Sequence, residues 1–100
     1  MAVHAVAAIA AMQSAAVAAG LTSFGIGTDF GGSVRWPAHC TGVASLRPSA
    51  GLVPNTGVLP HSGLPNRQVV SSDSFQCWIQ TIGPLSRSAR DLALLLHVMS

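Results

Sequence analysis

The most informative absence in this chain of 100 residues is lysine, because all five of its Lys/Arg-type side chains are arginines. A P-loop needs a lysine that reaches the nucleotide phosphates, so that class of site is excluded. Charged residues make up only 8% of the chain, against about 25% in an ordinary soluble protein. Hydrophobic residues make up 49%, which leaves little polar surface for a compact domain. We therefore interpret the chain as an interior piece of a larger α/β protein.

The chain also has few groups that could bind nucleic acid or metal. Its formal net charge is +2, and its arginines are spread along the sequence, so no basic patch for nucleic acid is expected. The two cysteines, Cys40 and Cys77, have neither metal-ligand nor disulfide-framework spacing, and we expect free, buried thiols. The histidines show no ligand spacing either. We expect no metal.

The first 20 residues are rich in alanine but lack the basic segment that begins an export signal. No stretch of about 20 strongly apolar residues is present, which excludes a membrane span. These features predict a cytoplasmic chain.

Local patterns predict most of the elements. The alanines of residues 2–19 predict a helix that ends at Gly20, and residues 22–27 predict a buried strand. Pro37 suits the first turn of a helix that runs to about Gly42, followed by a short strand over residues 43–46.

The second half is less regular. Residues 47–67 carry Pro or Gly every few positions and predict a loop. Residues 68–82 are mixed, with a short helix or strand near residues 75–82. A capping box at Ser88–Asp91 starts the last predicted helix, and its apolar residues recur at helical spacing: Leu92, Leu95, Leu96 and Met99.

The stretch that carries chemistry is the segment between the first predicted strand and the next helix. It places Ser33 directly after two glycines, with Asp29 and Arg35 nearby. Glycines let the backbone approach a substrate and direct successive N–H groups at one point, as an acyl-transfer nucleophile with an oxyanion hole requires. A plain Gly-Gly-Ser turn is the alternative that the local sequence leaves open. For Asp29 and Arg35 we favour a supporting ion pair or helix cap over direct substrate contact.

Two other templates do not fit this segment. A nucleophile elbow needs glycine two residues after the serine, where Arg35 stands. The glycines of residues 25–31 are spaced one residue too far apart for a dinucleotide fingerprint. Trp36 and residues 59–65 are candidates to line a site, with a place in the core as the alternative for Trp36.

Five segments together resemble the signature of the amidase signature family of serine hydrolases: residues 15–21, 24–38, 40–42, 46–48 and 83–87. The resemblance implies an α/β fold in which helices surround a mixed β-sheet. Residues 1–100 would form a partial domain, with residues 1–14 departing from the family pattern.

The resemblance also implies a site. Ser33 would attack the carbonyl carbon of a small-molecule amide, and the backbone N–H groups of Phe30, Gly31, Gly32 and Ser33 would form the oxyanion hole. The family uses no cofactor and no metal. Its proton relay runs through a second serine to an unprotonated lysine.

Two parts of that relay are missing from this chain. There is no lysine, and no Gly-Gly-Ser-Ser-Gly-Gly loop precedes the alanine-rich segment. An unassisted serine hydroxyl is a weak nucleophile, so we predict that the chain alone does not hydrolyse amides. The remainder of the fold or a partner chain would be needed. The alternative is a non-catalytic remnant or an interaction fragment.

Overall fold

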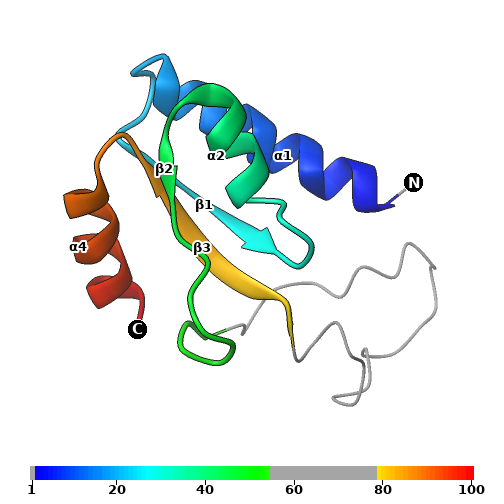
Figure 1. The fold of residues 1–100 in the computed structure, drawn as a ribbon, viewed down its shortest axis with the longest axis vertical. Helices are drawn as coiled ribbons and strands as arrows, with labels where there is room; N and C mark the ends of the chain where they lie inside the picture. Colours follow the sequence, from blue (N-terminus) through cyan, green and yellow to red (C-terminus); the bar gives the residue numbers. More distant parts are fainter. Residues whose placement is uncertain (1, 55–78) are drawn as a thin grey trace.

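The computed structural model describes residues 2–54 and 79–100. Three helices and three strands lie in these ranges: α1 (Ala2–Ala18), β1 (Phe24–Asp29), α2 (Arg35–Thr41), β2 (Ala44–Ser45), β3 (Thr81–Ser86) and α4 (Ala89–Met99). The strands form one sheet in the order β1-β3-β2, and both pairings are antiparallel (Figure 1). The described residues therefore form a small α/β unit. The larger fold, with a mixed β-sheet surrounded by helices, remains a prediction.

Helix α1 ends close to where the sequence predicts. Gly20 adopts a left-handed backbone with φ of 74°, and its N–H donates to Val17 O at 3.1 Å. Ala10, Ser14 and Val17 recur at helical spacing and are almost fully buried. In the described part of the chain, no helix is long and apolar enough to cross a membrane.

One face of β1 is built for close helix packing. Gly25, Gly27 and Asp29 alternate along this face, and a Cβ added at Gly27 would lie 3.0 Å from Cγ2 of Val34. Because the glycines leave room, α1 and α2 both approach the sheet on this side. Val34 and Leu85 are fully buried there and form the core with Ala38, which is 1% exposed.

Of the two elements that flank the serine segment, the strand is displaced from its predicted bounds, whereas the helix has Pro37 in its first turn as predicted. Strand β1 was expected over residues 22–27 but runs from Phe24 to Asp29, because Asp29 pairs with Thr81 across the sheet. Helix α2 begins at Arg35, two residues before Pro37. Proline is tolerated there because N–H groups in the first turn of a helix have no partner within the helix. The predicted end is confirmed by Gly42, which has a φ of 71°.

Strand β3 is the element that the sequence analysis misses. Gly83 and Pro84 lie inside it, and both residues disfavour the interior of a central strand. Pro84 nevertheless lies in the middle strand of the sheet, and its carbonyl accepts from Leu46 N–H at 3.1 Å. Tertiary pairing has overridden local propensity here. The predicted helix or strand near residues 75–82 falls largely outside the described residues, as does most of the predicted 47–67 loop.

Helix α4 begins with half of the predicted capping box. The Ser88 hydroxyl accepts from Arg90 N–H at 3.1 Å, as an N-cap should. Asp91 does not return to the Ser88 backbone; it accepts from the Ser86 hydroxyl at 3.2 Å instead. Of the apolar residues in α4, Leu92 is buried.

Candidate functional site

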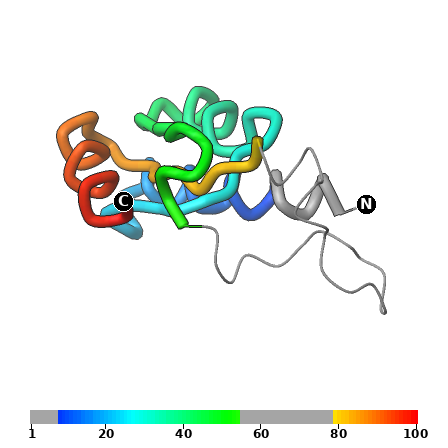
Figure 2. The backbone as a smooth tube through the Cα atoms, turned by 90° about the horizontal axis from the view of Figure 1, so that it is seen from below, coloured from blue at the N-terminus to red at the C-terminus, as the bar shows by residue number. Residues whose placement is uncertain are grey.

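Five residues, 30–34, connect β1 to α2 and form a tight bend that we call the serine turn. Gly32 has a φ of 110°, a conformation that residues with a side chain rarely adopt. Its carbonyl accepts from Trp36 N–H at 2.8 Å, so α2 grows directly out of the turn. Figure 2 shows the turn and α2 next to each other on the same side of the strands.

The Asp29 carboxylate holds the serine turn through hydrogen bonds to its backbone. The Asp29 side chain is fully buried at the end of β1. The carboxylate accepts backbone hydrogen bonds from Gly32 at 2.9 Å, Arg35 at 3.2 Å and Val34 at 3.3 Å. Three N–H groups of the turn and of the start of α2 thus converge on one carboxylate, which acts as a helix cap from outside the helix.

Arg35 neutralises this carboxylate with a two-pronged ion pair. Its Nε donates to Asp29 Oδ2 and its Nη2 to Asp29 Oδ1, both at 3.0 Å. Burial alone raises the pKa of Asp29, but the hydrogen bonds from Arg35, Gly32 and Val34 outweigh it and hold the pKa below the ordinary value of 3.8. The same pair raises the pKa of Arg35. The pair is therefore ionised at neutral pH.

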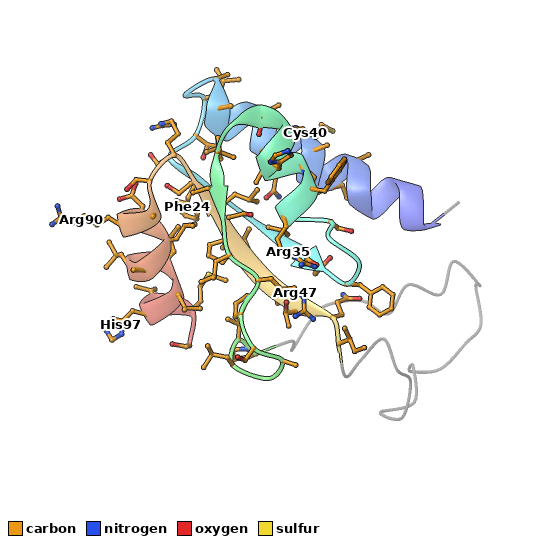
Figure 3. The ribbon with its side chains drawn as sticks, in the orientation of Figure 1. Phe24, Arg35, Cys40, Arg47, Arg90 and His97 are labelled. Carbon is orange, nitrogen blue, oxygen red and sulfur yellow. The ribbon has the colours of Figure 1, made fainter. Side chains whose placement is uncertain are left out.

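Arg47 is a second cation at Asp29 that the sequence analysis does not single out. Its Nε lies 3.6 Å from Asp29 Oδ1, and its Nη2 donates to Ile79 O, just before β3. In Figure 3 Arg35 and Arg47 lie close together, one at the start of α2 and one beyond β2. The only signal in the sequence is the position of Arg47 in the segment 46–48. Two arginines and one carboxylate leave a local charge of +1.

Ser33 lies in the middle of the turn and is partly buried. Within the part of the chain that the structure describes, neither its hydroxyl nor its N–H forms a hydrogen bond, and the same holds for Gly31 N–H. Gly32 N–H differs from these groups because it is already bound to Asp29. Phe30 begins the turn with a side chain that is 43% exposed.

An open pocket of about 420 Å³ adjoins the serine turn. It is lined by Gly31, Gly32, Arg35, Trp36 and His39. Trp36 projects from α2 with 70% of its surface exposed, so the alternative place in the core is wrong for it. Its ring centroid lies 5.9 Å from that of His39, with the planes tilted by 35°. Residues 59–65, the other predicted lining, lie outside the described residues.

Cys40 corrects one further expectation. Its thiol is free, as predicted, but it is exposed on α2 and not buried. The reason is that α2 turns Pro37 and Ala38 toward the sheet, which leaves His39 and Cys40 on its outer side. Cys77 lies outside the described residues.

Comparisons with known proteins give one consistent result. The family model described as Amidase matches residues 13–100. An indoleacetamide hydrolase from Bradyrhizobium diazoefficiens is 40% identical over 85 residues, which cover 85% of this chain and 15% of that protein.

The chain is also similar to Glutamyl-tRNA(Gln) amidotransferase subunits from two further organisms. The protein from Deinococcus deserti is 41% identical and that from Legionella pneumophila is 37% identical, each over 88% of this chain and 15% of the relative. The chain thus spans about 15% of the length of these relatives.

Proposed function

Because the chain belongs to the amidase family, we propose that it supplies the nucleophile segment of an amide hydrolase. Ser33 Oγ would attack the carbonyl carbon of the amide, and the C–N bond would break as the nitrogen takes a proton and leaves. Water would then cleave the resulting acyl ester, release the carboxylic acid and restore the hydroxyl. The observation that carries the proposal is the serine turn, where Asp29 fixes the backbone around a hydroxyl that forms no described hydrogen bond.

The oxyanion of the tetrahedral intermediate would be held by backbone N–H groups. The proposal assigns this role to Gly31 and Ser33, whose N–H groups form no hydrogen bond among the described residues. It gives Gly32 N–H a positioning role, because that group already donates to Asp29. One oxyanion donor of this kind typically contributes about 2.7–4 kcal/mol to transition-state stabilisation.

The proposal takes the proton acceptor from outside this chain. The family resemblance assigns it to a lysine acting through a second serine, and the chain contains no lysine. We therefore propose that the remainder of an amidase domain, or a partner chain, completes the site. Steady turnover of a simple aryl amide by the purified chain, abolished by Ser33→Ala, would overturn this part.

An exchange of segments tests the nucleophile directly. The matched segment of the Bradyrhizobium indoleacetamide hydrolase is replaced by the corresponding residues of this chain, which are 40% identical over 85 positions. We expect amide hydrolysis that Ser33→Ala abolishes and that Ser45→Ala, a serine in β2, leaves intact. Hydrolysis that survives Ser33→Ala would place the nucleophile elsewhere.

The second candidate function is an interaction fragment without catalysis. It is favoured by the missing lysine. It is also favoured by the large apolar side chains that are exposed on α1, β1, α2 and α4 in the described part of the chain. Sedimentation and thermal unfolding test this second candidate, since a cooperatively unfolding monomer would oppose a fragment that depends on a partner for its fold. For either function we propose a cytoplasmic location. The support is the free, exposed Cys40 thiol, a state typical of reducing compartments.

A further inference from the structure

The pocket beside the serine turn has a chemical character of its own. Two of its walls are aromatic, formed by the indole of Trp36 and the imidazole of His39. A third wall is the backbone of Gly31 and Gly32, which have no side chain to fill the space. At about 420 Å³, the pocket falls within the range of about 300–1,000 Å³ that small-molecule sites occupy.

Charge restricts what this pocket can hold. Arg35 lines it with a side chain that is 53% exposed, and no acidic side chain is among the described lining residues. Asp29 is buried beneath the turn and is outnumbered by Arg35 and Arg47. A ligand with a positive charge would therefore be repelled, whereas a neutral or anionic ligand would not.

From these features we infer that the pocket binds an aromatic acyl group, so that Trp36 is a specificity-determining residue. This inference rests on the proposed function, because it takes the ligand to be the amide that Ser33 attacks. The pocket suits the acyl side of that amide. An alkylamine leaving group would become a cation at neutral pH and face Arg35, whereas the acyl product is a carboxylate that Arg35 attracts.

Trp36 can make this selection without disturbing the fold. Its side chain lies on the outer face of α2, opposite to Pro37 and Ala38, which pack inward. An offset contact between two aromatic rings adds attraction beyond the area that it buries. A saturated ring of the same size would gain only the buried area. The predicted preference is therefore for a flat aromatic ring over an equally large aliphatic one.

Binding to the full 100-residue chain, followed by amide NMR, tests the inference without any bond cleavage. Phenylacetamide is the probe and cyclohexylacetamide the matched aliphatic control. We expect phenylacetamide to shift the signals of Gly31, Gly32 and the Trp36 indole N–H, with an affinity about three- to tenfold above that of the cyclohexyl compound. Trp36→Ala should remove this difference and Trp36→Phe should keep most of it. Leu94→Ala, at a residue that is 63% exposed on α4, is the surface control.

Equal affinities for the two amides, an unchanged difference in Trp36→Ala, or shifts confined to other parts of the chain would each overturn the inference. These outcomes are independent of the proposed function, because binding needs no lysine and no turnover. Conversely, loss of the Ser33 role in the segment exchange would leave the aromatic selectivity of the pocket measurable.

Discussion

At the scale of single residues, Asp29 organises the candidate site. One buried carboxylate accepts hydrogen bonds from three backbone N–H groups and forms ion pairs with two arginines. Its hydrogen bonds fix both Gly32, which shapes the turn, and Arg35, which lines the pocket. The position of Ser33 therefore depends on a side chain that has no part in the proposed bond-making steps.

Asp29→Asn should destabilise the chain and change its response to acid. The substitution leaves buried N–H donors without a fully suitable acceptor. Each unsatisfied group lowers the free energy of unfolding by about 1–3 kcal/mol. Because the folded pKa of Asp29 lies below 3.8, its contribution is complete above that pH and is lost as the pH falls through the folded pKa. The wild type should thus lose stability on acidification more steeply than Asp29→Asn. Urea unfolding across this pH window measures the difference, with Asp91→Asn on α4 as control.

If the wild type and Asp29→Asn lost stability in parallel as the pH fell, the ionised carboxylate would not be the group that holds the turn. The ion pair with Arg35 would then contribute little to the free energy of unfolding, as is usual for pairs exposed to solvent, and half of the Arg35 side chain is exposed.

Gly83 provides a second test at a single residue. A Cβ at this position would collide with the carbonyl oxygen of Leu46, and a backbone atom cannot move aside as a side-chain tip can. Gly83→Ala should destabilise the chain by about 1–3 kcal/mol, as overpacking usually does. Gly31→Ala, where a Cβ meets nothing within 4 Å, should change the free energy of unfolding by less than about 0.5 kcal/mol. Equal effects in chemical denaturation would contradict this packing.

At the scale of the elements, sequence patterns predict the helices better than the sheet. Alanine content, Gly20, Gly42 and Ser88 mark helix ends through local backbone chemistry, and the structure places the ends within about two residues of them. Strand β3 could not be found in this way. Its Gly83 and Pro84 give no local strand signal, and the strand is defined by its pairing with β1 and β2 on either side.

The site shows the same division between local and distant information. Asp29 and Arg35 stand out because they are oppositely charged residues only six positions apart, on either side of the serine turn. The contact of Arg47 with Asp29 and with Ile79, 32 positions later, depends on how distant segments meet, and no local pattern reports it.

The start of α4 offers a prediction at the element scale. Ser88→Ala removes the acceptor for Arg90 N–H and should cost about 1 kcal/mol, the usual effect of losing an N-cap. Ser88→Asp keeps an acceptor and should retain most of that stability. Urea midpoints of the two variants provide the comparison. A Ser88→Asp variant as unstable as Ser88→Ala would mean that the cap is not what holds this helix end.

At the scale of the whole molecule, the outer face of β1 carries two large apolar side chains that are partly exposed among the described residues. Phe24 is 45% exposed and Ile26 is 40% exposed on the side that faces away from Gly25 and Gly27. Exposed apolar patches of this kind mark contact surfaces or association sites.

Self-association of the chain should therefore depend on this face. Phe24→Ser combined with Ile26→Thr should lower the association constant by at least about tenfold. The reason is that both substitutions remove apolar surface that association would bury. Sedimentation velocity at several concentrations measures it. Leu94→Ser combined with Val98→Ser, at exposed positions of α4, is the matched control. Equal effects of the two pairs would mean that association is nonspecific.

The pairing of β1 with β3 also sets an order of events during synthesis. Phe24–Asp29 leaves the ribosome long before Thr81–Ser86, its only partner among the described strands. At about 5–20 residues per second, several seconds pass in which β1 has no neighbour and Asp29 has no Thr81 beside it. Arg87 likewise reaches back 70 positions to Val17. The nascent chain must therefore carry β1 without its partner strand until β3 has emerged. In that interval Phe24 and Ile26 are available to chaperones.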